Sequence, residues 1–324
     1  MPVLAELQAL EATMVQTREA IGMPLAGDLV APNAVPRSAL ALRPGFAIAS
    51  LDVAGASMHA PALLTIAPKQ VAAGEPLPAG CDAVIDLDAV SRDGATWAVV
   101  DSAEPGLHAR LTGHDLAGGA IIARAGWRVT PEIALAAELA GVDRLAVRRA
   151  SIRLEGFAEP ETAWLMARFD ALGIGSAGRA TPHLILRAVR KTGPRLALRP
   201  GDAAWIAQAG ESIVVDVPAR FDGVIGAWCA LVLPVLAKLL HQPLNRLPVE
   251  LTRKVTSAIG FTEVALFRLA AGHALPLAVG DLPLSAIAAA EAYAIVSSNL
   301  EGYPRGAQLD LISLDQPFTA KQRS

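Results

Sequence analysis

The sequence predicts a multi-domain α/β protein with a β-rich insert near its N-terminus and a small β-barrel at its C-terminus. Three observations lead to this prediction. The chain has 324 residues, which is long for one compact domain and suggests two to four modules. Segments with helical and with alternating periodicity follow one another through its middle, as is typical of α/β modules. After Pro243 short alternating runs are separated by Gly and Pro, as expected for a small barrel.

The first hundred residues are predicted to contain one helix and many short strands. Between residues 23 and 44 four prolines favour extended chain or loop, because proline fixes φ and removes a hydrogen-bond donor. From residue 47 to about 100, short apolar runs broken by Gly, Pro and Asp predict a small β-rich module. An amphipathic N-terminal helix is predicted from apolar residues at helical spacing, namely Leu4, Leu7, Leu10, Met14 and Ile21.

The middle of the chain carries clear helix and strand signals. Thr130, Pro131 and Glu132 suit the cap and first turn of a helix, which Gly141 ends. A second helix is predicted at 160–172 with Gly173 behind it, and strands at 144–147, 151–154 and 213–217.

The longest apolar run, 224–240, contains Pro234 and Lys238. Because a membrane span needs about 20 apolar residues, the run is interpreted as a buried helix of a protein outside the membrane.

Composition excludes several classes of function. Hydrophobic residues make up 53% of the chain and charged residues 18%, and the formal net charge of −3 offers no basic surface for nucleic acid or acidic membranes. Cys81 and Cys229 are isolated, which predicts neither a metal cluster nor a disulfide framework and fits a reducing compartment. The N-terminus carries Glu6 and Glu11 and lacks the layout of a signal segment, so we expect a cytoplasmic protein.

Several motifs occur in an order that resembles one known family. The C-terminal segment RKVTSAIGFTEVALFRL (253–269) and the run that follows it to residue 314 carry the most specific similarity. The other motifs are LAGDLVAPNAVPRSA (25–39), AAGEPLPAGCDAV (72–84), PGLHARLTGHDL (105–116), the segment 126–141, RPGDAAWIAQAG (199–210) and PARFDGVIGAWCALVLPVLAKLLHQP (218–243). Together they resemble the MoeA/gephyrin E-domain family of molybdopterin molybdenumtransferases across nearly the whole chain.

The resemblance implies a homodimer with four modules per chain. A linker and helical domain I would comprise residues 1–46 and 105–146, and a β-rich insert, domain II, residues 47–104. A truncated MogA-like α/β domain III would span 147–243, and a C-terminal β-barrel, domain IV, 244–324. The family inserts molybdenum from molybdate into adenylylated molybdopterin with the help of Mg²⁺, and these ligands are implied by the family alone.

Several family motifs are altered in this chain. The acidic residue of the family's "SamDGYA" falls on Pro44, its "GdELv" turn is replaced by residues 154–158, and its "GNP" turn is Arg220-Phe221-Asp222. The Gly-Gly-x-Ser loop has no counterpart between Leu172 and Arg199. Metal insertion needs oxygen ligands for magnesium and N–H groups for anions, and several such groups are lost.

Two classes of function therefore stay open. In the first, the chain is a divergent molybdenumtransferase that acts in molybdenum-cofactor biosynthesis. In the second, it is a non-catalytic relative, a scaffold or chaperone that binds molybdopterin or a molybdoenzyme partner. A structural dimer without a pterin role is a weaker third hypothesis.

The polar residues that match the family are the candidate ligand-binding residues. Asp82 either contacts ligand or satisfies the backbone donors of its own turn, and the turn role is favoured. Arg110 and Asp115 form either an anion contact with its orienting carboxylate or an ordinary ion pair. Arg253 and Ser257 open the barrel segment and face either an anion or solvent. No catalytic residue and no metal ligand is predicted.

Overall fold

The fold is known from a computed structural model that describes residues 2–190 and 196–318. The chain forms two compact units. Unit 1 comprises Met1–Gly27, Arg124–Pro131 and Arg144–Ser324, and unit 2 comprises Asp28–Ala123 and Glu132–Asp143. The finer division into four modules stays a prediction.

A five-stranded, mostly parallel sheet forms the α/β part of unit 1. Its strand order is β14-β13-β15-β18-β17. The three longer parallel strands carry alternating buried Ile, Leu and Val residues, and β17 closes the sheet antiparallel to β18. The strands are β13 (Ser151–Glu155), β14 (Gly175–Ser176), β15 (Leu184–Val189), β17 (Trp205–Ala209) and β18 (Ser212–Pro218).

The predicted buried helix is confirmed. It runs as α4 (Phe221–Ala227), a π-helical turn η3 (Trp228–Val232) and α5 (Leu233–Leu239). The helix is long and apolar enough to cross a membrane by length and composition, but 78% of its most apolar window is buried inside the fold. Trp228 packs edge-on against Phe169 with ring centroids 5.1 Å apart.

Helix α3 (Glu159–Ala171) also matches its prediction, including its end. Gly173 has φ +65° and follows the last turn, where the N–H of Ile174 donates to the carbonyl of Phe169 at 2.9 Å. This is the hydrogen bond of a Schellman-type helix end. The segment 173–178 therefore caps a helix and leads into β14.

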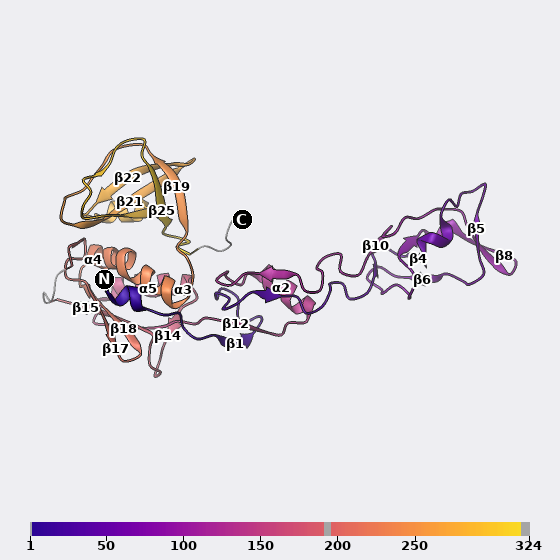
Figure 1. Ribbon diagram of the computed structural model, residues 1–324, viewed down its shortest axis with the longest axis horizontal. Coiled ribbons are helices and arrows are strands. Elements are labelled where there is room, and N and C mark those ends of the chain that lie inside the picture. The colour runs from indigo at the N-terminus through magenta and orange to yellow at the C-terminus, as the bar shows by residue number, and fades with distance from the viewer. Residues whose placement is uncertain (1, 191–195, 319–324) are drawn as a thin grey trace. The chain divides into compact units, whose positions relative to one another are not determined.

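The C-terminal strands form a closed five-stranded barrel, which confirms the predicted β-barrel. The hydrogen-bonded order β21-β22-β19-β25-β23 closes through the pairing of β23 with β21. These strands lie together at the orange-to-yellow end of the chain (Figure 1). They are β19 (Arg246–Leu251), β21 (Thr262–Ala270), β22 (His273–Val279), β23 (Ala292–Val296) and β25 (Gln308–Ser313); smaller elements are β16 (Leu198–Arg199), β20 (Val255–Thr256), α6 (Leu284–Ala289) and β24 (Gly302–Tyr303).

The prediction of one long N-terminal helix is wrong. Helix α1 covers only Pro2–Glu6, and Thr13–Gln16 form strand β1, antiparallel to β12 (Arg144–Val147). The apolar spacing is real, since Leu4, Leu7 and Leu10 pack against the core of unit 1. Residues 13–16 instead gain backbone hydrogen bonds from a partner strand 130 residues away, which local periodicity does not reveal.

Unit 2 is built from short strands and one helix, as the prolines and alternating runs predict. Helix α2 (Pro131–Ala140) begins and ends as expected, with Gly141 at φ +90°. The two three-stranded sheets of the insert are β6-β4-β7 and β5-β9-β8. The elements are β2 (Leu29–Val30), β3 (Leu40–Ala41), β4 (Gly45–Ile48), η1 (Ser50–Val53), β5 (Ala62–Leu64), β6 (Lys69–Val71), β7 (Ala83–Ile85), η2 (Leu87–Ala89), β8 (Val90–Asp93), β9 (Thr96–Val99), β10 (Ala109–Arg110) and β11 (Ile121–Ala123).

Candidate functional site

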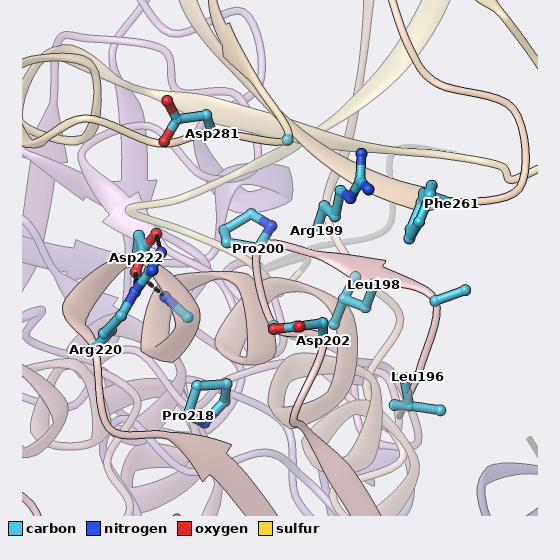
Figure 2. A pocket seen from close by; sticks show the side chains of 14 residues that line it. Leu196, Leu198, Arg199, Pro200, Asp202, Pro218, Arg220, Asp222, Phe261 and Asp281 are labelled. Atoms are coloured by element: carbon cyan, nitrogen blue, oxygen red, sulfur yellow. Dashed lines mark hydrogen bonds and ion pairs between the residues drawn. The ribbon is translucent and has the colours of Figure 1, made fainter. Parts of the chain in front are cut away.

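A cavity of about 640 Å³ lies in unit 1 beside the carboxyl end of strand β18. Ligands of α/β sheets commonly bind at this edge, where the chain leaves the sheet in a loop. The wall is formed by the turn that precedes β17, the turn between β18 and α4, and two loops of the barrel (Figure 2). Its charged residues are Arg199, Asp202, Arg220, Asp222 and Asp281.

Glycine lets helix α4 pack directly on the turn that contains Arg199 and Asp202. A Cβ atom added at Gly226 would lie 2.0 Å from the carbonyl oxygen of Pro200, which no side chain tolerates. Gly226, in the second turn of α4, therefore lets the helix approach this turn closely. The close approach brings both turns to one wall of the cavity.

The side chain of Arg199 is held by the barrel. Its Cζ atom lies 3.4 Å from the ring centroid of Phe261, and β16, which ends at Arg199, pairs in parallel with the start of β21. A guanidinium above an aromatic face gains cation–π attraction. The contact orients a permanent positive charge at the cavity wall.

Arg220 and Asp222 form a close ion pair at the start of α4. The Nε of Arg220 donates to Oδ1 of Asp222 at 3.0 Å, its Nη2 donates to Oδ2, and the N–H of Gly223 donates to Oδ1 at 2.8 Å. Figure 2 shows the two paired side chains. The hydrogen bond to Asp222 raises the pKa of Arg220. The side chain of Asp222 is 7% exposed, so its carboxylate is a fixed part of the wall.

Two further carboxylates belong to the same cavity. Asp202 and Asp281 are exposed, and neither side chain hydrogen-bonds to another residue in the parts of the chain that the structure describes. The charges of both also help to raise the pKa of Arg220. Three carboxylates thus face two guanidinium groups, and the two carboxylates without partners are ready to accept hydrogen bonds from N–H donors of a ligand.

A buried carboxylate in the barrel supports the loops that carry Phe261 and Asp281. Glu263 is 6% exposed, and its Oε2 accepts hydrogen bonds from the hydroxyl of Ser257 at 2.7 Å and from the N–H of Ala258 at 3.0 Å. A Cβ added at Gly280 would lie 2.3 Å from Oε1 of Glu263, so only glycine fits beside the carboxylate. Glu263 therefore anchors the loop that leads to Phe261 and lies directly against Gly280, the neighbour of Asp281.

The matched polar residues of unit 2 make local contacts. The carboxylate of Asp82 accepts hydrogen bonds from the N–H of Ser50 at 2.7 Å and from its hydroxyl at 2.8 Å, at the start of η1. Asp82 therefore satisfies a donor, but one 32 residues away rather than in its own turn. Arg110 and Asp115 form an ion pair with side chains 40% and 41% exposed, and this contact lowers the pKa of Asp115.

The two barrel candidates differ from each other. Arg253 is exposed. Ser257 is 8% exposed and its hydroxyl is bound to Glu263, so of the two alternatives for the barrel segment the solvent-facing one does not hold for Ser257. It is buried because Glu263 needs a donor inside the barrel. None of the five predicted residues lines the cavity, and whether any of them binds ligand stays a prediction.

The charged residues of the cavity were missed as site residues, although two sequence signals lie nearby. The motifs 199–210 and 218–243 contain Arg199, Asp202, Arg220 and Asp222, but their similarity to the family does not by itself mark these side chains as ligands. A turn that follows a strand and leads into a helix lies at the edge of an α/β sheet, where ligands commonly bind. Asp281 lies in the barrel without such a signal.

The residues that the structure describes do not form a magnesium site of their own. No group of three or more His, Cys, Asp or Glu side chains in residues 2–190 and 196–318 is arranged to hold a metal ion. Magnesium is bound in octahedral geometry by oxygen ligands. No step of a reaction is therefore assigned to a bound magnesium ion.

The fold and the cavity define a mixed α/β protein with a C-terminal five-stranded barrel and a charged pocket at a sheet edge. Residues 2–140 match the MoeA N-terminal region (domain I and II). The chain is 28% identical over 163 residues to molybdopterin molybdenumtransferase 2 of Mycobacterium tuberculosis, covering 45% of this chain and 40% of the relative. It is 30% identical over 141 residues to the molybdopterin molybdenumtransferase of Synechococcus elongatus, covering 38% and 35%.

Solved structures extend the similarity of fold to the full chain. The molybdopterin biosynthesis MoeA protein from Pyrococcus horikoshii superposes with a TM-score of 0.74 over 97% of both chains at 17% identity. A molybdenum cofactor biosynthesis protein from Pyrococcus furiosus superposes with a TM-score of 0.59 over 96% of both chains at 16% identity. The chain is a distant homologue of the MoeA family. Its sequence matches to the curated relatives span about 40% of their length or less.

Proposed function

We propose that the protein acts in the molybdenum-cofactor pathway and binds molybdopterin in the cavity beside β18. The observation that carries this proposal is the charged cavity at the sheet edge of a MoeA-like fold. The relatives in M. tuberculosis and S. elongatus are named for action on molybdopterin. A volume of about 640 Å³ suits a ligand of this size.

The chemistry of the wall matches a pterin. The amino-pyrimidinone edge of a pterin presents adjacent N–H donors, and the carboxylates of Asp202 and Asp281 are acceptors without partners among the described residues. Arg199 is oriented by Phe261 and offers N–H donors to an oxygen of the ligand. These residues would bind and orient the pterin. Molybdate is the substrate from which members of the family transfer molybdenum to the pterin.

Retention of the pterin tests this proposal. The purified protein is denatured and oxidised, and the fluorescence of released pterin is measured against protein concentration. We expect a substoichiometric but clear signal that falls about tenfold or more when Asp202 and Asp281 are both replaced by Asn, since each hydrogen bond to a charged group contributes about 1.5–3 kcal/mol. Exchange of Asp216, which is paired with Arg187, for Asn serves as a matched control. A wild-type protein that retains no pterin when expressed in a host that makes molybdopterin argues against the proposal.

The first candidate is a molybdenumtransferase that acts on the pterin it binds, and the second is a scaffold that binds the pterin without catalysis. It is favoured by the ion pair of Arg220 and Asp222, because this contact occupies donors at the start of α4 that would otherwise hold an anion. A mixture of purified protein, adenylylated molybdopterin, molybdate and Mg²⁺ distinguishes the two candidates. Formation of the molybdenum-loaded pterin at a rate above the protein-free reaction supports the enzyme, and retention of the pterin without metal insertion supports the scaffold.

A further inference from the structure

We propose that Asp222 determines which ligands the cavity accepts, because its carboxylate takes the position that an anionic group of a ligand would occupy. The proposal concerns the cavity of the proposed function and rests on it for the class of ligand. The proposal assigns to Asp222 a role in ligand specificity. The cavity would bind the uncharged and N–H-bearing groups of its ligand, and Asp222 would exclude a phosphate or another anion from the start of α4.

The groups that surround Asp222 are those that bind anions in many proteins. A backbone N–H at the first turn of a helix and a guanidinium fork are both donors suited to phosphate. Here the helix that begins at Phe221 continues to Leu239. The N–H of Gly223 and the Nε and Nη2 of Arg220 donate to the carboxylate of Asp222.

An incoming anion must compete with a carboxylate that is covalently part of the site. Asp222 loses no translational freedom on binding these donors, whereas a free phosphate does, so the resident group has the advantage. Its side chain is 7% exposed, whereas that of Arg220 is 77% exposed, so an anion is kept from this position because the Nε and Nη2 of Arg220 and the N–H of Gly223 are already bound, and not because the guanidinium is inaccessible. Asp202 and Asp281 add negative charge to the same cavity and further disfavour an anion.

The exchange Asp222→Ser tests the proposal as a gain of binding. Serine removes the charge and most of the side chain while it keeps a small polar group in the first turn of the helix. We expect calorimetric titration with inorganic phosphate to show binding that is about tenfold or more tighter than that of the wild-type protein. The double exchange Asp222→Ser with Arg220→Ala should abolish the gain, because the guanidinium then no longer contributes.

Asp216→Ser is the matched control. Asp216 also pairs through two hydrogen bonds with an arginine, Arg187, and it does not line the cavity. The control changes the net charge equally and should leave phosphate binding at the wild-type level. If Asp222→Ser unfolds, Asp222→Asn keeps an acceptor for the N–H of Gly223 while it removes the charge, and the same titration is made with that variant.

The outcomes separate this inference from the proposed function. A folded Asp222 variant that binds phosphate no better than wild type overturns the inference and leaves Asp222 as the ion-pair partner of Arg220 only. A gain that persists without Arg220, or that Asp216→Ser shares, overturns it as well. Retention of pterin by the wild-type protein is measured separately, so its failure contradicts the proposed function while the phosphate titration still decides the role of Asp222.

Discussion

The hydroxyl of Ser257 donates a hydrogen bond of 2.7 Å to the carboxylate of Glu263 inside the C-terminal barrel. Both residues are buried, with exposed fractions of 8% and 6%. The same carboxylate oxygen accepts the N–H of Ala258, and Gly280 leaves room for its other oxygen. This contact therefore fixes the loop that leads to Phe261, beside the glycine that precedes Asp281.

Replacement of Glu263 by Ala should destabilise the protein. The change leaves the buried hydroxyl of Ser257 without an acceptor, which costs about 1–3 kcal/mol, and it also removes the hydrogen bond to the N–H of the exposed Ala258. We expect the free energy of unfolding from urea titration to fall by about 2–4 kcal/mol. Glu301→Gln, on an exposed side chain, is the control and should change it by less than about 0.5 kcal/mol. A Glu263→Ala variant as stable as the control would show that the loops hold their positions without the carboxylate.

Replacement of Arg110 by Ala should leave stability almost unchanged. The ion pair with Asp115 is about 40% exposed on both sides, and such pairs contribute about 0–1 kcal/mol. The variant is therefore a clean probe of ligand binding, since its fold is retained. We expect retention of pterin to drop by about ten- to hundredfold if Arg110 contacts ligand, by loss of a charge-assisted bond. A folded variant that retains pterin at the wild-type level would make Arg110 a surface partner of Asp115 only.

A partly buried histidine in the α/β sheet accepts hydrogen bonds from its neighbour. The Nδ1 atom of His183 lies 3.1 Å from the backbone nitrogen of Ser151, whose N–H donates to it, and 2.9 Å from the Ser151 hydroxyl oxygen. Burial lowers the pKa of His183, and the charge of Glu211 opposes this shift. The neutral imidazole is thus the form that the fold prefers.

Stability should therefore decline in mildly acidic solution. The pKa of His183 is lower in the folded than in the unfolded chain, so the neutral imidazole contributes to the free energy of unfolding. This contribution is complete above the ordinary pKa of about 6.5, and it is lost as the pH falls through that value toward the folded pKa. Thermal unfolding at pH 7.5 and 5.5 measures the decline. His183→Asn keeps an acceptor but does not titrate, so its melting temperature should fall less between the two pH values. An equal fall in both proteins would assign the effect to other groups.

Exposed leucines on α2 predict how the chain associates with a second copy. Leu135 and Leu139 are one helical turn apart and 59% and 56% exposed, and the cross-strand pair Val30 and Ile121 in the same unit is also exposed. We expect the wild-type protein to sediment at about twice the chain mass of 33.6 kDa and the double exchange Leu135→Lys, Leu139→Lys to sediment as a folded monomer. Leu51→Lys, at a side chain 87% exposed, is the control and should remain dimeric. A wild-type monomer at micromolar concentration would refute the predicted dimer.

The sequence alone determined the elements whose signals are local. The cap residues Thr130 and Pro131 predicted the start of α2, Gly141 and Gly173 the ends of α2 and α3, and the apolar run 224–240 the buried helix. These predictions succeeded because capping, proline geometry and apolar periodicity act within a few residues. The order of short motifs also predicted the similarity to the MoeA family, which the match of residues 2–140 to the MoeA N-terminal region supports.

Only the tertiary structure decided which polar groups meet. Strand β1 forms because residues 13–16 find a partner at 144–147, and no local pattern competes with those backbone hydrogen bonds. Arg220 and Asp281 share one cavity although 60 positions of sequence separate them, and Ser257 is buried because the barrel closes around Glu263. A side chain's charge partners and burial depend on contacts across the folded chain, so they follow from the topology and not from the spacing of residues along the sequence.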